Sequence, residues 1–246
     1  MDMRPVDRLV AAALLGRVTQ VRRMVAADPA LLSARNMFGA GAVHAAHYGG
    51  QDGVLAALGD LGLGMDGFLA AELGRVHELR EVLVTDPGFA GRFDERGSTA
   101  LHGAAYWGQH EAAGLLLDSG ADPNAVSRDG FLRIPPLGEA VATTPGIAQP
   151  SDSEDAVLGL VRLLLERGAD VNGRRGDGMT ALHAACWRGL GRVAQELLDA
   201  GADPASTATA GPHQGQTPAD TALAQGHLLL AAQLDVPGQP VSSPYG

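Results

Sequence analysis

Apolar residues recur along the chain at intervals of three and four, and this spacing predicts short amphipathic helices. Val18, Val21 and Val25 fall on one face of such a helix. Clusters of Gly, Pro and Asp interrupt the pattern, as at Asp28-Pro29 and at 168–170. Residues of these types favour turns and end helices. The pattern therefore predicts a succession of short helices joined by turns.

Two segments of the chain share one frame. They are Gly97-Ser-Thr-Ala-Leu-His102-Gly-Ala-Ala-Tyr-Trp-Gly108 and Gly178-Met-Thr-Ala-Leu-His183-Ala-Ala-Cys-Trp-Arg-Gly189. An apolar helix follows each and ends at Gly120-Ala-Asp122 or Gly201-Ala-Asp203. The frame closely resembles the ankyrin repeat, with its T-P-L-H-x-A-A-x-x-G opening and G-A-D ending. The resemblance implies an all-α fold, an ankyrin-repeat solenoid of about seven helix–turn–helix units.

Aligning the chain on the His of this frame gives one domain over residues 1–234. The aligned positions are Val10, His44, Phe68, His102, Gly138, His183 and Asp220. The units are expected at about 5–35, 36–64, 65–93, 94–126, 127–174, 175–208 and 214–234, and a disordered tail at 235–246. Gly16 and Gly74 are 58 residues apart, as are His44 and His102. This interval indicates that the first two units were duplicated to give the third and fourth.

The resemblance assigns structural roles to the motif residues. Thr99, Thr180 and Thr217 are expected to cap their helices. The side chains of His44, His102 and His183 are expected to be buried and to bridge neighbouring repeats; the leucines expected in the core include Leu165 and Leu198. The Pro-, Ser-, Asp- and Gly-containing stretch 143–155 predicts an exposed loop in the fifth unit.

The resemblance also indicates a binding surface. In this family the two residues before the Gly that closes the first helix line a concave groove, together with the tip of the preceding turn. The candidates in these positions are Met37, Phe38, Tyr48, Glu95, Arg96, Tyr106, Trp107, Asp177, Met179, Trp187 and Arg188. Tyr, Trp and Arg dominate interface hot spots, which favours binding to another protein. The alternative is that the rings pack against adjacent helices.

Composition narrows the function further. The chain has no Lys, so Schiff-base catalysis, pyridoxal phosphate attachment and a P-loop are excluded. Its Ala-, Gly- and Arg-rich composition favours a bacterial source. A net charge of −10 argues against nucleic-acid binding. The single Cys186 and the lack of a long apolar segment favour a cytoplasmic protein without membrane attachment.

Two chemical hypotheses compete with simple binding. His44 and His47 are spaced to offer two metal ligands from one helix, and Cys186 lies one helical turn after His183. Structural roles explain these residues better, so no metal, cofactor or catalytic residue is predicted. The sequence thus favours a non-enzymatic protein-interaction scaffold. The alternatives are an enzyme or small-molecule binder with an aromatic pocket under a 143–155 lid, and self-association.

Overall fold

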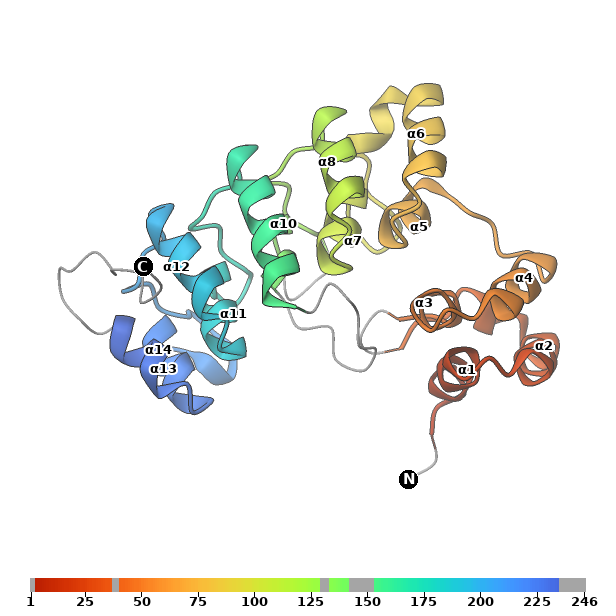
Figure 1. The fold of residues 1–246 in the computed structure, drawn as a ribbon, viewed down its shortest axis with the longest axis horizontal. Helices are drawn as coiled ribbons and strands as arrows, with labels where there is room; N and C mark the ends of the chain where they lie inside the picture. Colours follow the sequence, from red (N-terminus) through yellow and green to blue (C-terminus); the bar gives the residue numbers. More distant parts are fainter. Residues whose placement is uncertain (1–2, 37–39, 129–132, 142–152, 235–246) are drawn as a thin grey trace. The chain divides into compact units, whose positions relative to one another are not determined.

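The computed structural model describes residues 3–36, 40–128, 133–141 and 153–234. These residues form seven consecutive helix pairs (Figure 1), and within them only two isolated β-bridges accompany the helices. The predicted all-α ankyrin fold is confirmed. No helix in the described ranges is long and apolar enough to span a membrane.

The chain divides into two compact units, here called the N-terminal module (residues up to 66) and the C-terminal module (from 67). The prediction of one domain over 1–234 stays a prediction. The N-terminal module contains α1 (Pro5–Leu14), α2 (Val18–Ala27), α3 (Ala42–Tyr48) and α4 (Asp52–Asp60). Helix α1 packs on α3, and α2 packs on α4. This module therefore consists of two stacked helix pairs.

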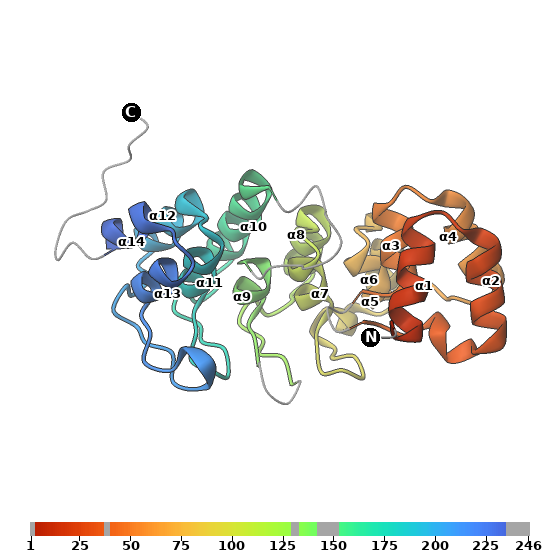
Figure 2. The same cartoon turned by 90° about the horizontal axis from the view of Figure 1, so that it is seen from below.

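The C-terminal module contains five helix pairs. Their bounds are α5 (Gly67–Glu72), α6 (Val76–Thr85), α7 (Ala100–Tyr106), α8 (His110–Asp118), α9 (Pro136–Val141), α10 (Glu154–Glu166), α11 (Ala181–Arg188), α12 (Gly191–Asp199), α13 (Pro218–Ala224) and α14 (Leu228–Leu234). The first helices α5, α7, α9, α11 and α13 contact one another in that order (Figure 2). The second helices α6, α8, α10 and α12 form a parallel row. The module is thus a two-layered stack.

Helix boundaries recur at the interval of 58 residues. Helices α2, α3 and α4 begin at residues 18, 42 and 52, whereas α6, α7 and α8 begin at 76, 100 and 110. Their ends are displaced by the same interval. These three helices therefore have the same lengths as their counterparts, although α1 has ten residues and its counterpart α5 has six. The shared boundaries support duplication of a two-pair segment.

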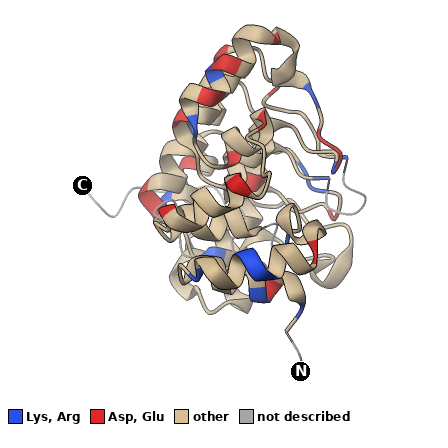
Figure 3. Ribbon diagram, turned by 90° about the vertical axis from the view of Figure 1, so that its right-hand side faces the viewer, with Lys and Arg blue, Asp and Glu red and all other residues tan. Residues whose placement is uncertain are grey.

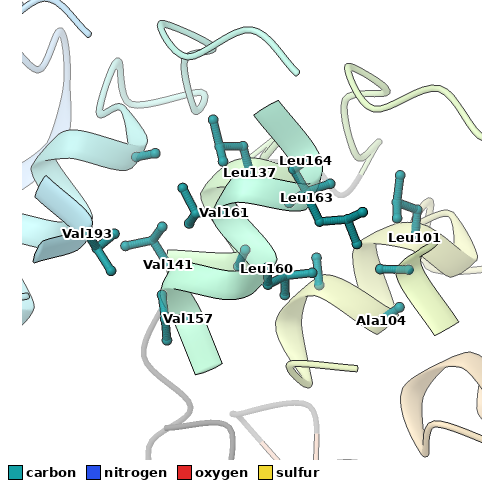
Figure 4. Packing of buried hydrophobic residues seen from close by; sticks show 14 of the residues in the cluster. Leu101, Ala104, Leu137, Val141, Val157, Leu160, Val161, Leu163, Leu164 and Val193 are labelled. Carbon is teal, nitrogen blue, oxygen red and sulfur yellow. The ribbon is translucent and has the colours of Figure 1, made fainter. Parts of the chain in front are cut away.

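The core of the C-terminal module is built by helix faces of Leu, Val and Ala. In α10, Leu160, Val161 and Leu164 point among residues of the neighbouring helices (Figure 4) and are at most 1% exposed. Leu165 and Leu198 are only partly buried, which corrects their prediction as core residues. Residues three and four apart share a helix face, so Leu164 is buried and the adjacent Leu165 lies towards the edge of that face.

The predicted loop 143–155 ends earlier than expected. Helix α10 begins at Glu154, and the Ser153 hydroxyl oxygen accepts the backbone N–H of Ala156 at 3.3 Å. Glu154 and Asp155 lie in the first turn, where acidic side chains interact favourably with the helix dipole. Residues 143–152 of this loop, and the predicted tail 235–246, lie outside the described residues.

Candidate functional site

His102 fixes the first helix of the fourth pair to the fifth pair. Its Nδ1 accepts the backbone N–H of Thr99 at 3.2 Å and lies 2.7 Å from the Thr99 hydroxyl. Its Nε2 lies 2.9 Å from the carbonyl oxygen of Ile134, which requires a proton on Nε2. The ring is 2% exposed. One side chain therefore holds a helix start and bridges two pairs, as predicted.

His183 makes the same arrangement in the sixth pair. Nδ1 accepts the Thr180 N–H at 3.1 Å, and Nε2 donates to the carbonyl of Gln216 at 3.2 Å. Burial lowers the pKa of His183, although the bond to Gln216 opposes that shift. The imidazole is therefore held in its neutral form.

His44 and Asp220 are variants of this arrangement. His44 is fully buried; its Nδ1 accepts the Gly41 N–H at 3.3 Å, and the Arg35 guanidinium lies 3.0 Å from its Nε2. The predicted burial and backbone bonding of all three histidines are thus confirmed. Asp220 accepts the N–H of Thr217 at 2.9 Å and its hydroxyl at 2.8 Å, and these bonds lower the pKa of the Asp220 carboxyl. The Thr217 hydroxyl accepts the Asp220 N–H in return, which completes a capping box.

The chemical hypotheses gain no support from the geometry. Cys186 is fully buried, and this burial raises the pKa of its thiol to about 12. The thiol is therefore protonated at neutral pH and unsuited to nucleophilic attack. In the described part of the chain, no cluster of three or more His, Cys, Asp or Glu side chains is arranged to hold a metal ion.

The aromatic candidates have different environments. Trp107 is 2% exposed and contacts the Tyr106 ring edge-on, with 5.5 Å between ring centroids. Trp107 is therefore a core residue, which corrects its expected position in an open groove. Tyr106 is half-buried. Trp107 directly follows the last residue of α7, and its large apolar surface is removed from water.

Trp187 presents its ring to solvent. It is 38% exposed, and the ring of His213 meets it edge-on with centroids 4.9 Å apart. His213 belongs to a short 3₁₀-helix, Gly211–His213, in the loop before α13. The neighbouring Arg188 donates to the carbonyl of Val141 at 3.3 Å. The end of α11 and the next loop therefore form one partly exposed aromatic surface.

The turn before α7 contains two candidates, of which one forms ion pairs and the other is exposed. Arg96 contacts the carboxylates of Glu72 and Asp94, each at 2.8 Å, whereas Glu95 is exposed. Burial acts to lower the pKa of Arg96, but the two carboxylates outweigh it and raise the pKa. Glu72 is 3% exposed. A Cβ on Gly103 would lie 2.8 Å from its Cγ, so Gly103 provides the space for the Glu72 side chain.

Asp177 and Met179 stabilise the turn before α11. They are 8% and 6% exposed, which corrects their expected position at an open turn tip. The Asp177 carboxylate pairs with Arg175 at 3.0 Å and accepts the Met179 N–H at 3.2 Å. The Asp177 carbonyl accepts the N–H of Thr209 at 2.8 Å. Polar groups of Asp177 are therefore used to connect two loops.

The remaining candidates belong to the N-terminal module. Tyr48 is half-buried and contacts the edge of His47, with centroids 5.0 Å apart. Met37 and Phe38 lie outside the described residues.

Sequence reasoning missed two contacts in the C-terminal module. The first is the approach of His213 to Trp187, for which a Gly-Pro turn is the only local signal. The second is the Arg128 guanidinium, whose Cζ lies 3.7 Å from the centroid of the Phe93 ring. Neither contact belongs to the repeat motif, and each joins residues from different loops or helices.

Comparisons with known proteins agree with the repeat pattern. A model described as ankyrin repeat matches residues 96–128, and one described as ankyrin repeats (many copies) matches residues 153–195. The chain is 40% identical to the B-cell lymphoma 3 protein homolog of Mus musculus over 107 residues, 44% of this chain and 21% of that protein. It is 36% identical to Ankyrin repeat and SOCS box protein 16 of Mus musculus over 151 residues, 58% of this chain and 31% of that protein. The chain thus matches less than a third of the length of either relative.

Proposed function

Because the chain belongs to the ankyrin repeat family, we propose that it is a non-enzymatic scaffold that binds another protein through the groove and turns of its C-terminal module. Ankyrin repeats are generally protein–protein interaction modules, and stacked repeats provide extended binding surfaces. The exposure of Trp187 is the observation that carries the proposal, since this large ring is 38% exposed beside His213. Exposed aromatic rings of this kind are typical interface anchors.

The proposed surface combines anchors of different chemistry. Trp187 and the half-buried Tyr106 supply rings, and the exposed Glu95 supplies charge at a turn. Arg96 and Arg188 contribute through the parts of their guanidinium groups that remain exposed. A standard interface buries about 800 Å² on each partner, an area within reach of several helix pairs. Tyr48, Met37 and Phe38 extend the proposal to the N-terminal module.

The test is recovery of the native protein partner followed by affinity measurements on variants of the full chain. Trp187→Ala is expected to weaken binding by about 2 kcal/mol or more with little change in melting temperature. Val84, an apolar side chain of α6 that is 75% exposed, provides a matched control through Val84→Ala. Unchanged affinity of Trp187→Ala, or an equal loss in Val84→Ala, would contradict the proposed surface.

We also propose a cytoplasmic location for the protein. Its single cysteine is a free, fully buried thiol, and such a thiol needs no oxidising compartment. The bacterial source and the possibility of self-association stay predictions.

A further inference from the structure

Charge is unevenly divided within the C-terminal module, whose helices and turns both carry charged residues (Figure 3). Helices α6, α8, α10 and α12 contain nine acidic residues and three arginines. The loops at 92–98, 127–134, 173–179 and 207–216 contain six arginines and four acidic residues. A loop edge rich in arginine, in a chain of net charge −10, favours an anionic region of a partner.

Arg128 is positioned for carboxylate recognition. Its guanidinium lies over the Phe93 ring at 3.7 Å, and its residue is exposed. Its backbone N–H donates to the carbonyl of Gly97 at 2.7 Å, and this bond holds the backbone from which the side chain extends. A guanidinium stacked on a ring keeps its in-plane N–H groups available, and these match the two oxygens of a carboxylate. Stacking also reduces the ordering that binding requires.

Arg133 and Arg174 are exposed in neighbouring turns, which approach each other because a Cβ on Gly173 would lie 3.4 Å from Cγ of Pro135. Ser127 and Ile134 exchange two hydrogen bonds, of 3.1 and 2.9 Å, so the adjacent residues Arg128 and Arg133 lie at the base of one loop. Arg174 donates to the carbonyls of Gly178 and Thr207, each at 3.1 Å. Within the described ranges, none of these three arginines has a carboxylate partner.

The other loop arginines differ in this respect. Arg92, Arg96 and Arg175 each pair with a carboxylate of this chain at 2.6 to 3.0 Å. Their charges are therefore largely neutralised within the fold, and they add little attraction for an anionic partner.

We propose that the edge formed by Arg128, Arg133 and Arg174 binds an acidic segment of the protein partner, whose Asp or Glu carboxylates pair with the guanidinium groups. This inference rests on the proposed function and defines the chemistry of its partner. A nucleic acid is disfavoured because the chain has a net charge of −10 and the second helices of the same module contain nine acidic residues, which would repel a long polyanion. A short acidic peptide can bind at the loops without bringing its negative charge close to the acidic second helices.

The test uses the full chain and a fluorescein-labelled oligoglutamate peptide, with binding followed by fluorescence anisotropy. Saturable binding that weakens with added salt is expected. The Arg128→Ala/Arg133→Ala variant is expected to bind the peptide at least about fivefold more weakly, because two guanidinium groups that would pair with its carboxylates are lost. Arg80→Ala removes an exposed arginine of α6 and is the matched control, with unchanged affinity expected. Arg128→Lys keeps the charge, but it is expected to bind more weakly than the wild type because lysine lacks the planar fork.

Several results would overturn the inference: no binding of oligoglutamate, equal loss in Arg80→Ala, equal binding of an oligolysine peptide, or tighter binding of oligothymidine. The native partner separates this inference from the proposed function. If Trp187→Ala weakens partner binding but Arg128→Glu leaves it unchanged, the acidic-segment inference fails and the proposed function stands. If neither variant changes partner binding, the proposed surface itself fails.

Discussion

Gly74 contacts Gln109 so closely that a Cβ on Gly74 would overlap the side-chain oxygen of Gln109. Gly74 has a φ of 66°, in the left-handed region that favours glycine. The same contact joins Gly16, with a φ of 68°, to Gln51. Gln51 and Gln109 each precede the second helix of the following pair. The turn after a first helix is therefore built identically in both copies of the duplicated segment.

Replacing Gly74 by Ala is expected to destabilise the protein by about 1–2 kcal/mol, chiefly because a side chain at positive φ is strained. The overlapping atom belongs to the flexible end of Gln109 and can move away. The free energy of unfolding in urea for Gly74→Ala and for Gly74→Ala/Gln109→Ala checks this explanation.

The double variant should recover little of the lost stability. Gly114→Ala is the control, because Gly114 lies within α8 and its added Cβ would meet Leu163 at an ordinary 3.9 Å. That variant is expected to be as stable as the wild type or more so, by up to about 1 kcal/mol. Full recovery in the Gly74/Gln109 double variant would show that crowding, and not backbone strain, sets the cost.

Adjacent leucines of α10 provide a test of the core. Leu164→Ala is expected to cost about 2–5 kcal/mol of unfolding free energy, because the side chain is fully buried and its loss leaves a cavity. Leu165→Ala is expected to cost about 1 kcal/mol, since that side chain keeps partial contact with water. Equal losses in denaturant titrations of the two variants would contradict the helix phase described for α10.

The two tryptophans are expected to respond differently to truncation. Trp107→Ala should destabilise the fold by about 3–5 kcal/mol, because it empties a buried volume. Trp187→Ala should change stability by less than about 1 kcal/mol, because much of its ring already faces water. Thermal melts of both variants measure this contrast. A larger loss for Trp187 would place that ring in the core and remove the basis of the proposed surface.

Stability is expected to fall as the pH drops below about 6.5, the ordinary pKa of histidine. Burial lowers the pKa of His183 in the folded chain, so the unfolded chain takes up a proton at a higher pH. Proton uptake by the unfolded state favours unfolding, and the stability due to neutral His183 is lost as the pH falls through that window. Urea titrations at about pH 7.5 and about pH 5.5 measure the difference.

The variant His183→Asn isolates this contribution. It is expected to be less stable at neutral pH, because the bond from Nε2 to Gln216 is lost. Its stability should also depend less on pH across the same window. An unchanged pH dependence would assign the effect to other groups.

The repeat frame predicted the motif residues whose side chains bond to backbone groups at constant positions in the repeat. His102 and His183 were predictable because the frame places a Thr three residues before each and a backbone carbonyl of the following pair beyond it. The start of α10 was placed too late by the predicted loop 143–155, although Ser153 followed by Glu154 and Asp155 is a typical helix start.

The candidate site was harder to predict, because side-chain chemistry decides orientation within the same frame. Trp107 and Arg188 occupy equivalent positions, yet the indole is buried and the guanidinium remains partly exposed. Burial of an apolar ring lowers the free energy of the folded state, whereas burial of a charged group raises it. The stacking of Arg128 on Phe93 requires two loops to lie close together, and the residue pattern within either loop does not predict this contact.

The space that Gly103 leaves for Glu72 also constrains the order in which this sequence can change. In the first copy the equivalent residues are Ala45 and Leu14, so a methyl group is tolerated there beside an apolar side chain. With Glu72 present, the same methyl group would lie 2.8 Å from its Cγ and would push a buried carboxylate away from Arg96. A lineage can therefore acquire Ala at position 103 readily only after position 72 has changed. We therefore expect the residue at position 103 to depend on the residue at position 72, with glycine retained for as long as Glu72 is present.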